Sequence, residues 1–351
     1  MRKRSFRSVV AVVAAALLAT ACSGSSSPHT SAEPSPSPAP SAPPPTCPLT
    51  GSAPKTASLL DRPAVAVKVE NNPVAYPLSG LEKADLVFEE VVEGGLTRFM
   101  AIYDCGDASS VGPVRSSRIV DPAIMIPATK ILADAGGNGI VLRHLKRKGI
   151  VNIDEDSAGA AMHRESRPGY AFEHTLYGNT KSLRKLGAAH YKKPPPDSYF
   201  KFGAAIDGGK KAKKITLDFG PASTITYAYK KGKYYRTDGT SPLVSATNGN
   251  KQISVDNVIV EFHKVDLSTH LVDVLGTPSP LIEDFTGTNK AVLFRGGKAY
   301  VGKWKRSYVG HPVKFVAKSG KEMTLTPGRT WVELLPDKTG QVNGSLSYSK
   351  K

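Results

Sequence analysis

The first 46 residues limit the fold most, because they cannot join a packed core and leave 305 of the 351 residues to form one. The chain starts with three arginines and a lysine within seven residues, followed by an apolar run over residues 9–19. That run is about half the ~20 residues that a helix needs to cross a bilayer, and this combination is typical of an export signal. We therefore expect residues 1–21 to be a signal peptide.

Cys22 follows the small residues Ala19, Thr20 and Ala21, an arrangement similar to a bacterial lipobox. In such a motif the cysteine is lipidated and becomes the mature N-terminus, and two acyl chains are enough for stable membrane attachment. This predicts a lipoprotein held by its lipid anchor on the outer face of the cell membrane. The alternative is an ordinary secretory peptide that is cleaved near Cys22 by chance.

The 24 residues after Cys22 contain eight prolines and eight serines, with Glu33 as the only formal charge. Such a composition buries too little apolar surface to offset the entropy of ordering. Residues 22–46 are therefore expected to be a disordered, lipidated tether. Proline-rich chain extends by ~3.1 Å per residue, so the tether would let the folded part work well away from the lipid surface.

Two further cysteines, Cys47 and Cys105, lie in the part of the chain that is expected to fold. In an exported domain, one cysteine at the entrance and one at the end of a β-rich run suggest a disulfide. The alternatives are two buried thiols or a reactive nucleophile at Cys105. The nearby Asp104 and Asp107 argue against a nucleophile, since they would raise the pKa of the Cys105 thiol.

Beyond the tether, short β-rich runs alternate with glycine turns. Residues 47–191 mix such runs with short helical segments, and residues 192–214, rich in lysine, proline and glycine, are expected to be a linker. Residues 215–351 are mostly strand, with hairpin turns at Lys231-Gly232 and Gly296-Gly297. The predicted fold is an α+β N-terminal domain with a mixed sheet and short helices, followed by a β-rich C-terminal domain.

Residues 89–98 form the most unusual polar cluster. If Gly94-Gly95 is a two-residue turn, Arg98 lies on the strand face that carries Glu89 and Glu93. A carboxylate pair beside an arginine could perform acid–base chemistry or bind a polar ligand, which makes Glu89, Glu90 and Glu93 the catalytic candidates. The alternative is a cross-strand ion pair that stiffens the hairpin.

A second cluster is Arg115-Ser116-Ser117-Arg118, followed by Asp121. Guanidinium groups bind phosphate, sulfate or carboxylate through paired hydrogen bonds, so Arg115 and Arg118 could hold such an anion. The alternative is that both arginines pair with Asp121 or with the glutamates of the preceding cluster.

His163 and His174 could form an acid–base or metal pair together with Asp154, Glu155 and Asp156. No paired spacing such as His-x-x-x-His occurs, so we expect neither a metal nor a cofactor. His174 is expected to be hydrogen-bonded within the fold and close to the ligand.

The net charge of +17 comes from 47 basic and 30 acidic residues. In a cytosolic protein it would suggest nucleic acid, but export makes that partner implausible. Outside the cell the common polyanions are phosphate-bearing wall polymers and anionic lipid head groups. A basic, solvated surface without a partner remains equally open.

Several of these stretches are similar to the YerB-like lipoproteins, a bacterial family described mainly as a domain of unknown function. The similarity extends over nearly all of the folded chain and includes Arg62-Pro63-Ala64-Val65-Ala66-Val67, Glu93-Gly94-Gly95-Leu96-Thr97-Arg98-Phe99, Gly112-Pro113-Val114-Arg115-Ser116-Ser117-Arg118, His174-Thr175-Leu176-Tyr177 and Pro327-Gly328-Arg329-Thr330-Trp331. The resemblance implies a mixed N-terminal domain and a smaller β-rich C-terminal domain on a lipid anchor, and it brings no established reaction. Asp134 stands where the family pattern has a histidine, so chemistry that needs that histidine is not expected here.

Together these features favour a non-catalytic envelope lipoprotein that binds an anionic or polar envelope polymer, or an envelope protein. The predicted ligand-binding residues share one cleft, lined by Phe99 or Tyr177, and are Glu93, Arg98, Arg115, Arg118 and His174. The competing hypothesis is an enzyme acting on an envelope polymer with a glutamate as acid or base, and a purely structural tethered module is a third.

Overall fold

The computed structural model describes residues 44–220, 222–282 and 285–350, and these belong to one compact unit that begins at Pro44. The signal peptide, the lipidation of Cys22 and most of the tether lie outside the described residues. No described helix is long and apolar enough to span a membrane.

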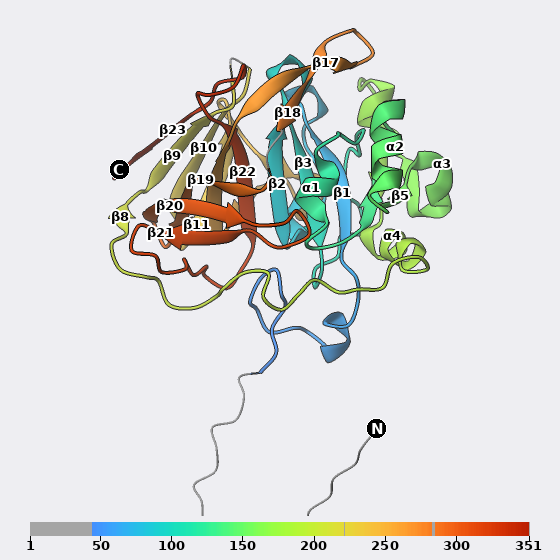
Figure 1. Cartoon of the computed structure of the whole chain (residues 1–351). Coiled ribbons are helices and arrows are strands. Elements are labelled where there is room, and N and C mark those ends of the chain that lie inside the picture. The colour runs from blue at the N-terminus through green and yellow to red at the C-terminus, as the bar shows by residue number, and fades with distance from the viewer. Residues whose placement is uncertain (1–43, 221, 283–284, 351) are drawn as a thin grey trace, which may run out of the picture. The chain divides into compact units, whose positions relative to one another are not determined.

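An 11-stranded mixed sheet forms the centre of the molecule (Figure 1). Both predicted domains contribute to it. The order along the main path is β21 (Lys314–Ala317), β20 (Lys298–Arg306), β19 (Gly287–Arg295), β16 (Asn257–His263), β22 (Thr330–Pro336), β2 (Leu86–Val91), β3 (Thr97–Tyr103), β1 (Val65–Asn71), β4 (Ile131–Ala133) and β5 (Val151–Ile153), with β8 (Lys210–Lys211) paired to β20. The strand β22 runs parallel to both of its neighbours and joins the two halves. Every residue of β1, β2, β16 and β22 is buried, as expected for strands covered on both faces.

Short helices and a second sheet pack against this central sheet. The helices are α1 (Asp121–Met125), α2 (Gly139–Arg147), α3 (Glu155–Ala158) and α4 (Thr180–Gly187). The second sheet contains β12 (Ser241–Pro242), β11 (Lys233–Asp238), β10 (Thr224–Lys230), β9 (Lys214–Asp218) and β23 (Ser345–Ser349), with β15 (Ser254–Val255) paired to β11. The predicted hairpins at Lys231-Gly232 and Gly296-Gly297 are confirmed as β10–β11 and β19–β20. The predicted α+β and β-rich parts are therefore present, and they share one sheet.

Three two-stranded ribbons complete the fold. They are β6 (Met162–Arg164) with β7 (Leu176–Gly178), β13 (Val244–Ser245) with β14 (Lys251–Gln252), and β17 (Val265–Val272) with β18 (Pro278–Ile282). The β17–β18 hairpin extends to the edge of the body near the start of α2 (Figure 1).

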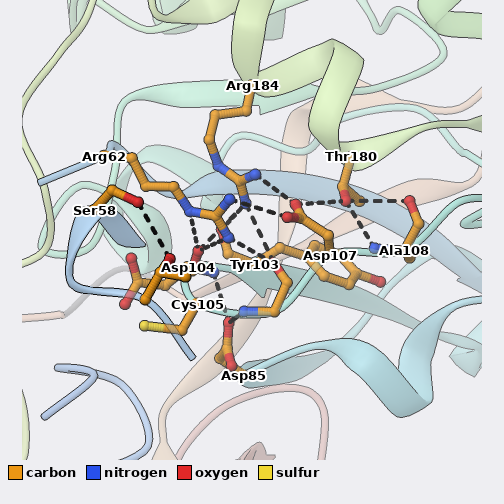
Figure 2. Close-up of polar contacts among 12 residues, drawn as sticks. Ser58, Arg62, Asp85, Tyr103, Asp104, Cys105, Asp107, Ala108, Thr180 and Arg184 are labelled. Carbon is orange, nitrogen blue, oxygen red and sulfur yellow. Dashed lines mark hydrogen bonds and ion pairs between the residues drawn. The ribbon is translucent and has the colours of Figure 1, made fainter. Parts of the chain in front are cut away.

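The disulfide between Cys47 and Cys105 is present, with the two Cα atoms 6.1 Å apart. Next to it, Arg62 and Arg184 both donate hydrogen bonds to the chain that follows β3 (Figure 2). The two guanidinium groups also share the carboxylate of Asp107. The disulfide and the two arginines thus fix the end of β3 to the start of the folded chain.

Candidate functional site

The largest polar concavity near the predicted site residues is a cleft of about 680 Å³, within the ~300–1,000 Å³ typical of ligand pockets. We call it the arginine cleft. Four of the five predicted ligand-binding residues line it, and they are Glu93, Arg98, Arg115 and Arg118. The wall is built from the end of β1, the β2–β3 turn, the 115–118 segment, the start of α2 and the tip of β17–β18.

The register of β2 and β3 corrects one prediction. Residues Glu93–Gly95 form a 3-10 turn, so Val92 pairs with Leu96 and Glu90 lies opposite Arg98. The predicted two-residue turn was therefore wrong by one position, and a slip of one residue moves side chains to the other face. Arg98 shares its face with Glu90 and Glu70, while Glu89 points to the opposite face.

Arg98 is the least compensated charge in the arginine cleft. Its single described hydrogen bond goes from Nη1 to the carbonyl oxygen of Ser116, at 3.0 Å. Among the described residues no carboxylate lies within ion-pair distance of its guanidinium. Burial, together with the positive charges of Arg118 and Arg115, lowers the pKa of Arg98 to about 9. An anion that enters the cleft would stabilise the charge of Arg98 by accepting hydrogen bonds from its guanidinium group.

Arg115 is also only partly satisfied. Its Nη1 donates to the carbonyl oxygen of Glu173, while its buried Nε has no hydrogen-bond partner among the described residues. The Nε atom lies 3.7 Å from a carboxylate oxygen of Glu70, too far for a hydrogen bond. The other oxygen of Glu70 is 2.7 Å from Nδ1 of His174. Glu70 is therefore shared, and Arg115 keeps hydrogen-bonding capacity for a ligand.

Arg118, in contrast, is occupied. It forms an ion pair with Glu93, and its backbone N–H donates to Asp121 at 2.6 Å. Burial by itself would raise the pKa of Glu93, but Arg118 and the hydroxyl of Ser279 outweigh it and hold that pKa below its ordinary value. The expected alternative, an arginine paired with a glutamate, thus holds for Arg118. This pair also connects β18, which carries Ser279, to the floor of the cleft.

The catalytic candidates Glu89 and Glu90 do not reach the arginine cleft. Glu89 is fully buried on the other face of the sheet and binds Arg236. Glu90 is buried against Lys68, and its pKa is raised to about 7 by burial and by the neighbouring Asp121. Of the three glutamates only Glu93 lines the cleft, and it is already paired, so no free carboxylate of this group is positioned for acid–base chemistry.

His174 lies just behind the cleft wall. It is buried and hydrogen-bonded to Glu70, which itself lines the cleft. This agrees with the expected hydrogen-bonded histidine, but its ring is not part of the lining. Within the described ranges no group of three or more His, Cys, Asp or Glu residues could hold a metal ion.

The expected aromatic lining is wrong. Phe99 packs on the opposite face of the sheet against Trp331, and the buried Tyr177 lies under Arg167. Much of the apolar lining comes instead from the β17–β18 hairpin, which sequence reasoning missed. Its residues Leu271, Val272, Val274 and Leu275 all line the cleft. The signal in the sequence was Asp273 followed by Gly276, a turn pattern inside an apolar stretch.

The fold and the cleft define a class of protein: an α+β part and a β-rich part that share one sheet, with an arginine cleft that both parts line. Residues 49–193 match the family model "Protein of unknown function (DUF3048) N-terminal domain", and residues 215–332 match the corresponding C-terminal domain model. The chain therefore belongs to the DUF3048 family, whose members include the YerB-like proteins.

Two comparisons with individual proteins agree with this assignment. The chain is 28% identical over 318 residues to "Putative lipoprotein YerB" of Bacillus subtilis (strain 168), which covers 83% of this chain and 86% of the relative. The crystal structure of the YerB protein from Bacillus subtilis matches with a TM-score of 0.69 at 25% identity, over 86% of this chain and 99% of that chain. Neither description names a reaction or a ligand.

Proposed function

We propose that this protein is a membrane-anchored, extracytoplasmic lipoprotein that binds an anionic ligand of the cell envelope in the arginine cleft. The anchor is Cys22, at the end of an export signal and before a proline-rich tether. The ligand groups are the guanidinium groups of Arg98 and Arg115, while Arg118 and Glu93 shape the cleft. The relative named as a lipoprotein supports the anchor, since it covers most of both chains.

The state of Arg98 is the observation that carries the binding proposal. Arg98 is half-buried, lies beside two other arginines and donates its one described hydrogen bond to a backbone carbonyl, so an anion in the cleft would stabilise its charge. A phosphate or carboxylate in the cleft could accept hydrogen bonds from Arg98 and from the unpaired Nε of Arg115. The two carboxylates that line the cleft, Glu70 and Glu93, are engaged by His174 and by Arg118.

Replacing Arg115 with alanine is expected to weaken binding of glycerol phosphate by ~1.5–3 kcal/mol, the range for a hydrogen bond to a charged group. Isothermal titration calorimetry on residues 44–351 measures this, since these residues include the whole compact unit. The free energy of unfolding should change little, because Arg115 is at the surface of the cleft and its one hydrogen bond is exposed. Arg143, an exposed arginine on α2, provides the matched control as Arg143→Ala.

Two outcomes would contradict this proposal. One is wild-type protein that binds neither glycerol phosphate nor a longer phosphate polymer. The other is an Arg115→Ala variant that unfolds, which would make the guanidinium a structural partner of Glu70 instead of a ligand group.

Replacing Cys22 with serine tests the anchor. Because a lipobox cysteine is the acceptor of the lipid, the variant should leave the membrane fraction, either as released protein or as an unprocessed precursor. Fractionation of cells that express the full chain, followed by mass measurement, detects both forms. A variant that is fully processed and still retained in the membrane would show that Cys22 does not carry the anchor.

A further inference from the structure

Exposed apolar side chains gather around the arginine cleft. Nine large apolar residues are exposed among the described residues; three of them line the cleft, and three more lie within two residues of a lining residue along the chain. We call these six the apolar rim, and they are Val74, Ile140, Phe172, Val272, Val274 and Leu275. Exposed apolar groups that are scattered singly need no explanation, whereas a group of them around one concavity indicates an interaction site.

The apolar rim comes from four separate parts of the chain. Val74 lies in a 3-10 turn after β1, Ile140 in the first turn of α2, Phe172 before β7, and the last three at the β17–β18 tip. Each of the first three is close to a cleft residue in the sequence: Asn72, Asn138 or Glu173. Of the six, Val272, Val274 and Leu275 line the cleft itself, and the other three flank lining residues along the chain.

Side-chain hydrogen bonds hold the turn at the tip of the β17–β18 hairpin. The carboxylate of Asp273 accepts hydrogen bonds from the backbone N–H groups of Leu275 and Thr277, at 2.9 and 2.8 Å. These bonds hold the pKa of Asp273 below its ordinary value, so its charge is used within the turn. The turn leaves Val274 fully exposed and Leu275 87% exposed, at the edge of the body where Figure 1 shows the β17–β18 loop. Two such side chains in water are unfavourable unless an apolar partner covers them.

The interior and the opening therefore differ in chemistry. Inside, Arg98 and Arg115 have unused hydrogen-bond donors, and the carboxylates of Glu70 and Glu93 are already engaged. At the opening, the apolar rim has no described partner for its most exposed members. A free anion would use the arginines and leave the rim in water. A molecule with an anionic head and hydrocarbon chains would use both.

From this arrangement we propose that the arginine cleft takes the phosphate-bearing head group of an anionic lipid while the apolar rim inserts among the lipid's hydrocarbon chains. This deepens the proposed function, on which it rests, by naming the ligand as an amphiphile. The charge of the protein agrees with it, since the chain keeps a formal charge of about +13 without the four positive charges of the leader. The apolar rim adds the contact that a basic surface alone does not provide.

The test uses residues 44–351 and vesicles of phosphatidylcholine, with or without phosphatidylglycerol. Wild-type protein should sediment with the anionic vesicles. The double variant Val274→Asp/Leu275→Asp should bind them at least about tenfold more weakly, because it removes two buried apolar contacts. The matched control is Leu186→Asp/Tyr308→Asp, which adds the same two charges at exposed apolar positions outside the rim and should bind like wild type. This control separates insertion from a change in net charge.

A second readout does not depend on affinity. A Leu275→Trp variant should show a blue-shifted emission with anionic vesicles, whereas a Tyr308→Trp variant should not. The native Trp304 and Trp331 are buried and give a constant background.

The outcomes separate this inference from the proposed function. If the Val274→Asp/Leu275→Asp variant binds vesicles like wild type, or if Leu275→Trp shows no shift, the lipid inference is wrong and a free anion or a protein partner is indicated. Binding of glycerol phosphate that depends on Arg115 would then still support the proposed function. If Arg115→Ala changes neither glycerol phosphate binding nor vesicle binding, both proposals fail.

Discussion

Replacing Arg236 with methionine is expected to lower the free energy of unfolding by about 3–5 kcal/mol, because it leaves a buried carboxylate without its partner. Arg236 is 1% exposed and binds both oxygens of Glu89, at 2.5 and 2.9 Å. Its Nε donates to Asp238 at 2.7 Å. Equilibrium unfolding in urea at neutral pH measures the loss.

Arg236 lies between two buried carboxyl groups, those of Glu89 and Glu333, and only the first needs its positive charge. Burial and the adjacent Glu89 raise the pKa of Glu333 well above its ordinary value, which favours the neutral form of Glu333 beside the charged Glu89. Burial would also raise the pKa of Glu89, but Arg236 outweighs it and keeps Glu89 ionised. The double variant Arg236→Met/Glu89→Gln should therefore recover part of the stability. The exposed Arg143→Met is the control and should change stability by less than about 0.5 kcal/mol. If Arg236→Met lowers the free energy of unfolding no more than this control does, the ion pair does not hold the two sheets together.

Replacing Lys68 with methionine should have a comparable effect that depends on pH. Lys68 is fully buried and forms ion pairs with Glu90 and with Asp121, the second at 2.7 Å. Without it, two carboxylates would share a dry site, and the loss is expected to reach about 3–5 kcal/mol at pH 8.

The sign of the pH dependence follows from Glu90. Its pKa in the folded protein is already raised to about 7 by burial and by Asp121, and removal of Lys68 raises it further. Because the unfolded chain has the ordinary pKa of ~4.3, the stability of the variant falls as pH rises between these two values. The destabilisation should thus be smaller at pH 5 than at pH 8 in urea titrations at equal ionic strength. The exposed Lys146→Met is the control, and a difference that does not change with pH would contradict the role assigned to Glu90.

Local patterns predicted the features that depend on local geometry. Glycines in the β10–β11 and β19–β20 turns, at Gly232, Gly296 and Gly297, favour those hairpins because their φ angles are positive there. The gathering of Arg98, Arg115 and Arg118 in one cleft also follows from short segments that fold back on themselves. The Glu93–Gly95 turn was harder to predict, because two adjacent glycines permit both a two-residue and a three-residue loop. The loop length decides which glutamate lies opposite Arg98.

Long-range pairing could not be predicted in this way. Nothing near Glu89 in the sequence indicates Arg236, which is 147 residues further along the chain. The β17–β18 tip was missed for the same reason, since Leu275 is far from Arg98 along the chain and meets the cleft only in the folded protein. A single exposed apolar residue in a loop is common, and it indicates an interaction site only when it lies close to others in the folded protein.

The placement of β22 has a consequence for how the chain is made. This strand, at residues 330–336, lies between β16 and β2 and is parallel to both, so the N-terminal half of the sheet is open at β2 until almost the whole chain is available. Synthesis delivers the N-terminus first, and an unpaired buried strand is prone to wrong pairing. Pairing of β22 therefore completes the sheet late, and a protein cut short before β22 would expose the unpaired edge of β2.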